Sequence, residues 1–88
     1  MHEILIGKRV DVIKIVSGIG GGKIKDQLKA EIVSVNDFVI TVVYIKKGIK
    51  TYRESFNTAN FAEGRVRIEL IDGGNIFYNS KIKQWEVK

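Results

Sequence analysis

The stretch from Leu28 to Phe56, LKAEIVSVNDFVITVVYIKKGIKTYRESF, has the pattern of three consecutive β-strands. Two apolar runs, 28–35 and 38–45, are followed by a mixed run, 49–56. The connections are Asn36-Asp37 and Lys46-Lys47-Gly48, and Asn, Asp and Gly tolerate the positive φ angles that tight hairpin turns need. Three hairpin-linked strands in an 88-residue chain predict a small antiparallel β-domain.

The middle run, 38–45, is apolar on both faces. Alternation places Phe38, Ile40, Val42 and Tyr44 on one face and Val39, Val43 and Ile45 on the other. A strand with two apolar faces is buried on both or lies at an interface. Two arrangements remain open: Trp85 and Val87 of the C-terminal tail cover the second face, or a partner does.

Upstream of this stretch, residues 8–16 form the first predicted strand. Val12 and Ile13 mark a change of apolar phase, which predicts a bulge or a strong bend there. A Gly-rich loop is expected over residues 17–25. Residues 24–32 fit either a short helix or a strand. The strand is favoured because the run 38–45, on the other side of the Asn36-Asp37 turn, has a strong strand pattern.

Downstream, residues 58–63 predict one helical turn, capped by Asn57 or Thr58 and ended by Gly64. The run 65–71 alternates cleanly as a strand, and 75–88 forms a strand-like tail. With a long loop after the first strand and one helical turn before the fifth, the layout resembles a Src-homology-3-like barrel. The resemblance covers roughly residues 8–71 and implies an all-β, five- to seven-stranded antiparallel barrel and a binding module. We expect residues 1–88 to form this single domain.

Composition limits the class of protein. The chain has 88 residues and no cysteine, so neither disulfides nor thiolate metal sites are available, and a reducing, cytoplasmic location is expected. The N-terminal residues resemble neither a signal peptide nor a membrane span. A net charge of +5 favours polyanionic partners.

Catalytic chemistry has little support in the sequence. The single histidine is His2, and no cysteine is present to form a nucleophilic dyad. Asp37 and Asp72 lie in predicted turns, while Glu54 and other strand carboxylates look solvated, so no acidic cluster of metal-binding spacing is seen. We therefore expect a non-enzyme without cofactor or metal.

Basic residues supply the leading functional hypothesis. They gather on the second hairpin and the fifth predicted strand, where arginine forks suit phosphate groups. We expect nucleic acid to bind an outer face formed by Lys46, Lys47, Lys50, Arg53, Arg65 and Arg67.

The Gly-rich loop is a second candidate. Gly22-Lys23 matches part of a phosphate-binding loop, but Ile24 stands where that motif needs Ser or Thr, so nucleotide hydrolysis is not expected. The loop can still hold an anion with its amides and lysines. Its residues are Gly20, Gly21, Gly22, Lys23 and Lys25.

The alternative function is a protein-protein or homo-oligomeric module, including an accessory protein of a phage or mobile element. It would use the second apolar face of 38–45, because exposed apolar patches mark interfaces. The predicted interface residues are Val39, Val43, Ile45 and Trp85.

Overall fold

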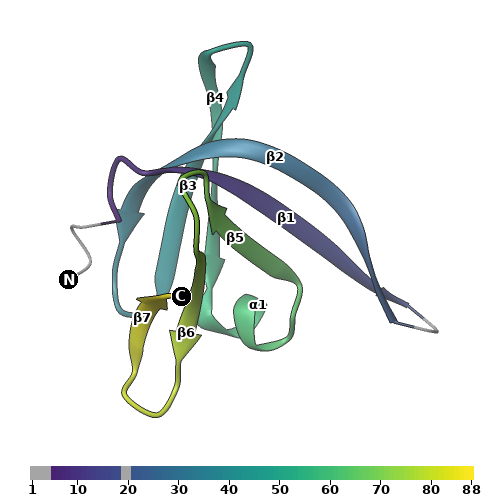
Figure 1. Ribbon diagram of the computed structural model, residues 1–88, viewed down its shortest axis with the longest axis vertical. Helices are drawn as coiled ribbons and strands as arrows, with labels where there is room; N and C mark the ends of the chain where they lie inside the picture. The colour runs from purple at the N-terminus through teal and green to yellow at the C-terminus, as the bar shows by residue number, and fades with distance from the viewer. Residues whose placement is uncertain (1–4, 19–20) are drawn as a thin grey trace.

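The computed structural model describes residues 5–18 and 21–88 (Figure 1). Its strands are β1 (Arg9–Gly18), β2 (Gly21–Val35), β3 (Val39–Lys46), β4 (Ile49–Asn57), β5 (Val66–Leu70), β6 (Asn75–Asn79) and β7 (Gln84–Val87). One short helix, α1 (Thr58–Ala62), lies between β4 and β5, so the helical turn predicted over 58–63 is confirmed. No helix in the described ranges is long and apolar enough to cross a membrane.

All seven strands belong to one antiparallel sheet in the order β4-β3-β2-β1-β5-β6-β7. The first four strands therefore follow the chain, while β5 returns to pair with β1 on its far side. The sheet curls around the core, as the arch of β1 and β2 over the other strands in Figure 1 shows. Its edge strands β4 and β7 do not pair with each other, so closure into a barrel is not confirmed.

The ambiguous segment 24–32 is strand, as favoured, because it lies within β2. The predicted Gly-rich loop is wrong for most of its length. Ser17 pairs with Gly22 and Gly18 with Gly21, so these residues continue the β1–β2 hairpin. A glycine run carries no side-chain pattern that distinguishes loop from strand, and the long partner strand decides its conformation.

The irregularity predicted in the first strand lies slightly further along. In the β1–β2 ladder, Lys14 pairs with Asp26 and Ile15 with Ile24, so Lys25 is the extra residue and the bulge belongs to β2. Val12 and Ile13 are buried on opposite faces, at 0% and 2% exposed. The change of apolar phase therefore reflects a strand covered on both sides there.

The core lies on the concave side of the curled sheet. Residues of all seven strands supply it, alternating along the longer strands as their two-residue period requires. Its buried members are Leu5, Val10, Val12, Ala30, Ile32, Ile40, Val42, Tyr44, Phe56, Val66, Ile68, Ile76 and Trp85. Trp85 packs edge-on against Phe61 and Tyr78, with ring centroids 4.9 and 5.2 Å away.

Helix α1 begins with a reciprocal cap. The Asn57 side chain accepts a hydrogen bond from the Asn60 amide at 3.0 Å, and the Asn60 side chain accepts one from the Asn57 amide at 2.9 Å. Such a capping box satisfies two of the amides that a helix start leaves unpaired. The fixed helix start lets Phe61 pack against the core beside Trp85.

Candidate functional site

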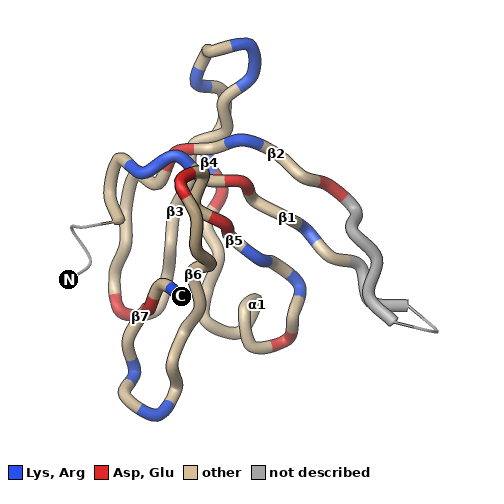
Figure 2. The backbone as a smooth tube through the Cα atoms, in the orientation of Figure 1, with Lys and Arg blue, Asp and Glu red and all other residues tan. Residues whose placement is uncertain are grey.

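Four of the six predicted phosphate-binding residues lie on the β3–β4 hairpin. We call Lys46, Lys47, Lys50 and Arg53 the hairpin cations; all four are exposed, and residues 46–53 include no carboxylate. Figure 1 shows this hairpin projecting past the arch of β1 and β2. Figure 2 shows Lys and Arg at its end without Asp or Glu beside them.

The end of the hairpin is a tight two-residue turn. Lys46 pairs with Ile49, which leaves Lys47 and Gly48 as the turn residues. Their φ angles are 53° and 77°, and positive φ at both positions is the requirement of a type I′ turn. The turn therefore holds the lysines on a short, defined arm.

Below the turn, β4 carries a bulge. Val43 pairs with Arg53 and Ile45 with Lys50, so Thr51 and Tyr52 both lie opposite Tyr44. The Thr51 hydroxyl donates to the Tyr44 carbonyl oxygen at 3.0 Å. The bulge shifts the alternation, so Lys50, opposite Ile45, lies on the outer face with Arg53, opposite Val43.

Tyr52 lies on the same face of β4 as Phe56, because the ladder from Arg53 to Phe56 is regular and the Tyr52 ring packs on core-facing Tyr44. Phe56 is 6% exposed, whereas Tyr52 is 58% exposed. The difference follows from position along the strand: Tyr44 is the last β3 residue in the register with β2, so the hairpin projects past the sheet where Tyr52 lies.

A hydrogen-bonded cluster lies beneath Tyr52. The Tyr44 hydroxyl donates to Glu54 Oε1 at 2.5 Å, and Lys14 Nζ lies 2.7 Å from the same oxygen. The Tyr52 ring packs on the Tyr44 ring, with centroids 4.8 Å apart and planes tilted by 45°. Glu54 is half-buried rather than solvated, because it shares the core-facing side of β4 with Phe56.

The cluster changes the acidity of two of its members. Burial first, and then the hydrogen bond to Glu54 and its charge, raise the pKa of the Tyr44 hydroxyl far above its ordinary value. Burial of Glu54 works to raise its pKa, but the hydrogen bonds from Lys14 and Tyr44 and the Lys14 charge outweigh burial and lower it. Glu54 is therefore a carboxylate and Tyr44 a neutral phenol at neutral pH.

Arg65 and Arg67 do not join the hairpin cations. Both are exposed, but they lie at the start of β5, and β3, β2 and β1 stand between β4 and β5 in the sheet. Arg65 also forms a 2.8 Å ion pair with Glu63. The predicted basic face is therefore divided into two separate groups.

The predicted apolar interface is largely covered. Val43 is 5% exposed, between its cross-strand neighbours Glu31 and Arg53. Glu31 also forms ion pairs with Arg9 and Lys50, whose aliphatic stems can shield apolar surface. Val39 and Ile45 on the same face are partly buried.

The position of Trp85 shows which face of β3 the C-terminal tail covers. It is 3% exposed and belongs to the concave core with Ile40 and Val42, not to the outer face of Val43. The tail therefore packs against the first face of β3, and cross-strand neighbours shield the second.

The predicted anion-binding segment lies partly outside the described residues. Gly20 is not among them, and Gly21, Gly22, Lys23 and Lys25 lie in β2. The main chain from Gly21 to Lys23 pairs with β1. The segment is thus a strand end rather than an open loop.

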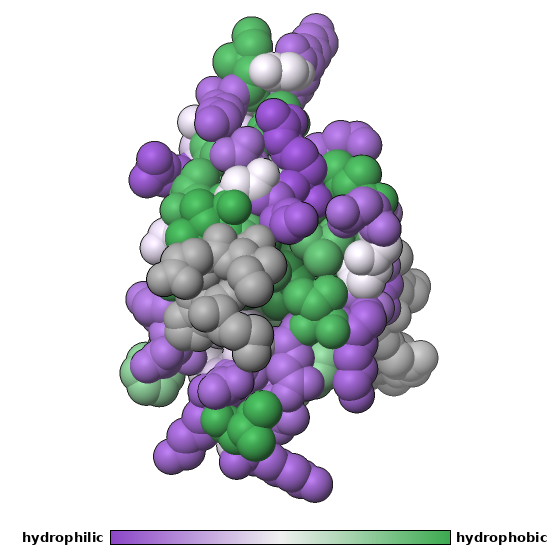
Figure 3. Space-filling model, turned by 60° about the vertical axis from the view of Figure 1, so that its left-hand side comes forward, coloured by the Kyte–Doolittle hydropathy of each residue, from purple (hydrophilic) through white to green (hydrophobic). Residues whose placement is uncertain are grey.

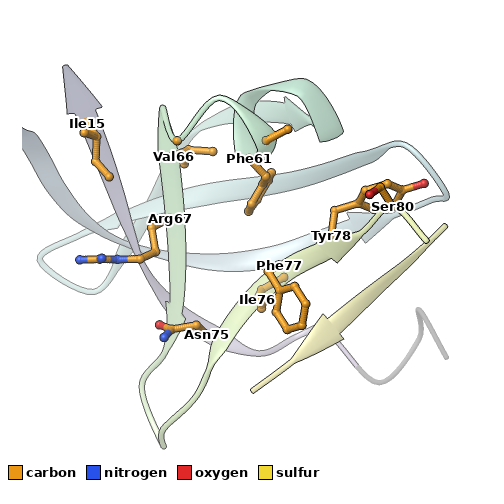
Figure 4. Close-up of a pocket in the computed structure, with 11 residues that line it drawn as sticks. Ile15, Phe61, Val66, Arg67, Asn75, Ile76, Phe77, Tyr78 and Ser80 are labelled. Atoms are coloured by element: carbon orange, nitrogen blue, oxygen red, sulfur yellow. The ribbon is translucent and has the colours of Figure 1, made fainter. Parts of the chain in front are cut away.

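A groove opens where β5 and β6 separate. Pairing between these strands ends at Ile68 and Ile76, and the space beyond has a volume of about 530 Å³. Phe61, Val66 and Tyr78 contribute apolar walls, and Figure 4 shows the Arg67 side chain extending away from Phe61 and Tyr78. The groove presents apolar surface without a directed charge.

Within the described ranges, no group of three or more His, Cys, Asp or Glu side chains could hold a metal ion. Comparison with protein-family models, curated proteins and solved structures gives no match. The functional argument therefore rests on the geometry of the chain itself.

Proposed function

We propose that this protein is a non-catalytic module that binds nucleic acid through the hairpin cations. The observation that carries the proposal is the projecting β3–β4 hairpin, with four cations in eight residues and no acid among them. Figure 3 displays this end of the molecule as mainly hydrophilic, with hydrophobic side chains beside it. Lysine and arginine in this arrangement attract phosphates and release their counterions on binding.

The pairing of the cations supports the same use. None of the described carboxylates forms an ion pair with Lys46 or Lys47, and the Lys50 contact to Glu31 is long, at 3.5 Å. Exposed pairs of that kind contribute little to stability. The hairpin cations are therefore available to phosphates at little cost to the fold.

The Src-homology-3-like layout, in which many small β-domains act as binding modules, remains our interpretation of the strand order. A cytoplasmic location remains our expectation from the lack of cysteine. The rival function, a protein interface on Val39, Val43, Ile45 and Trp85, receives less support because Val43 and Trp85 are buried.

The experiment compares two triple variants. Lys46→Gln/Lys47→Gln/Lys50→Gln neutralises the hairpin, and Lys81→Gln/Lys83→Gln/Lys88→Gln neutralises the β6–β7 hairpin and the residue after it. Each variant removes three positive charges, and each includes one lysine with positive φ, Lys47 or Lys83. Binding to labelled oligonucleotides is measured by fluorescence anisotropy at about 50 and 200 mM salt.

We expect the first variant to lose most of its affinity. Its plot of log binding constant against log salt concentration should be less steep by about 2–3, since each lost phosphate contact removes roughly 0.7–0.9 from the slope. The β6–β7 variant should stay close to the wild type. Equal losses in the two variants would show that only net charge matters. Wild-type binding that does not respond to salt would overturn the proposal.

A further inference from the structure

Tyr52 combines exposure with a fixed position. Its side chain is 58% exposed, although β4 continues from it to the buried Phe56. The ring lies opposite Tyr44 at the foot of the projecting hairpin, on the same face of β4 as Phe56. A large aromatic ring left open to water in this way is a candidate contact surface.

The ring is supported from beneath. It packs on Tyr44, which is 3% exposed, at a centroid distance of 4.8 Å. Tyr44 is fixed in turn by its hydrogen bond to Glu54, and Glu54 by its ion pair with Lys14. Because the support is ordered before any ligand binds, Tyr52 loses little conformational freedom on making a contact.

Cations lie beside the ring on the hairpin. Lys46 follows Tyr44 by two residues on β3, so alternation places it on the same face as the Tyr52 ring, and it is exposed. Lys47 follows it in the turn and is also exposed. An aromatic ring beside cations that can follow a phosphate backbone is the combination with which proteins hold unpaired bases. In a duplex, base faces are covered by their neighbours and are reached only by unstacking them.

We infer that the hairpin selects single-stranded nucleic acid and that one unpaired base stacks on Tyr52. This inference rests on the proposed function, because the hairpin cations provide the phosphate contacts. Tyr44, Glu54 and Lys14 act as positioning residues that hold the Tyr52 ring in place. The ligand is a single strand of DNA or RNA, and stacking does not depend strongly on its sequence.

The test uses three variants and two probes. Tyr52→Leu removes the aromatic face but keeps an apolar side chain over Tyr44, and Tyr52→Phe keeps the ring. Phe38→Leu is the matched control, because Phe38 is also exposed, at 64%, and precedes β3 at the end away from the turn. The probes are an oligothymidylate of about 15 nucleotides and a duplex of the same length.

We expect Tyr52→Leu to bind the single strand roughly five-fold or more weakly, with duplex binding unchanged. Tyr52→Phe and Phe38→Leu should bind both probes like the wild type. Circular dichroism and urea unfolding check that each variant is folded. Equal losses on both probes, or no loss with Tyr52→Leu, would overturn the inference.

The two proposals fail in different ways. If the lysine variant of the hairpin loses binding while Tyr52→Leu does not, only the stacking inference is wrong. If the wild type binds neither probe in a salt-dependent manner, the proposed function is wrong and the inference falls with it.

Discussion

The indole Nε1 of Trp85 donates a hydrogen bond of 2.8 Å to the main-chain carbonyl oxygen of Asn36, 49 positions earlier in the chain. This bond joins β7, at one edge of the sheet, to the turn between β2 and β3. The buried ring also contacts Phe61 and Tyr78. Trp85 thus links β7 to the β2–β3 end of the sheet, and in the described strand order β7 pairs with neither β2 nor β3.

Replacement of Trp85 should therefore destabilise the fold. For Trp85→Phe we expect the free energy of unfolding in urea to fall by about 1–3 kcal/mol, because a hydrogen bond and part of the packing are lost. Ile82→Ala, on the same hairpin but 54% exposed, is the control and should change it by less than about 0.5 kcal/mol. Similar losses of unfolding free energy in the two variants would show that Trp85 does not link these parts of the sheet.

Stability should decrease in acid because of Glu54. Its pKa is lower in the folded protein than in the unfolded chain, so its stabilising contribution is present above the unfolded value and is lost as the pH falls through the folded one. The free energy of unfolding, measured from about pH 7 to about pH 3, should fall less steeply in Glu54→Gln than in the wild type. Glu63→Gln, which breaks an exposed ion pair, should leave the wild-type slope unchanged; a slope altered as in Glu54→Gln would contradict the assignment.

Stability should also decrease in alkali because of Tyr44. Its pKa is raised in the folded protein, so its contribution is complete below the ordinary tyrosine pKa, near 10, and is lost as the pH rises above it. Tyr44→Phe should flatten the alkaline decline of the unfolding free energy, while Tyr52→Phe, which keeps Tyr44, should preserve it. An unchanged decline in Tyr44→Phe would exclude Tyr44 as its source.

The turn of the hairpin can be stabilised by one substitution at Lys47. Lys47 has a φ of 53°, a conformation that asparagine adopts more readily than lysine. Lys47→Asn should therefore raise the free energy of unfolding by about 0.5 kcal/mol, because a residue whose backbone preference matches the native conformation stabilises the fold. Lys46→Asn removes the same charge from a paired strand position and should bring no gain; a gain there would mean that charge repulsion, not φ, is relieved.

Much of the fold could be predicted because its signals are local. Turn residues and apolar alternation lie within a few positions of the strands that they define, so β3, β4 and α1 follow from short stretches. The Gly-rich segment was missed because glycine carries no such signal, and pairing with β1 extends it. The exposure of Tyr52 does not follow from alternation, because Tyr52 keeps the phase of the buried Phe56, and only the strand pairing shows that the hairpin projects beyond the sheet there.

The residues of the candidate site were likewise predictable only where they are close in the sequence. The sequence by itself determined that Lys46, Lys47 and Lys50 stand together, since neighbours across a tight turn stay neighbours in space. Only the tertiary structure decided that Arg65 and Arg67 lie elsewhere, because β5 pairs with β1 rather than with β4. Alternation specifies the face of a strand on which a residue lies, but the order of strands depends on contacts between distant parts of the chain.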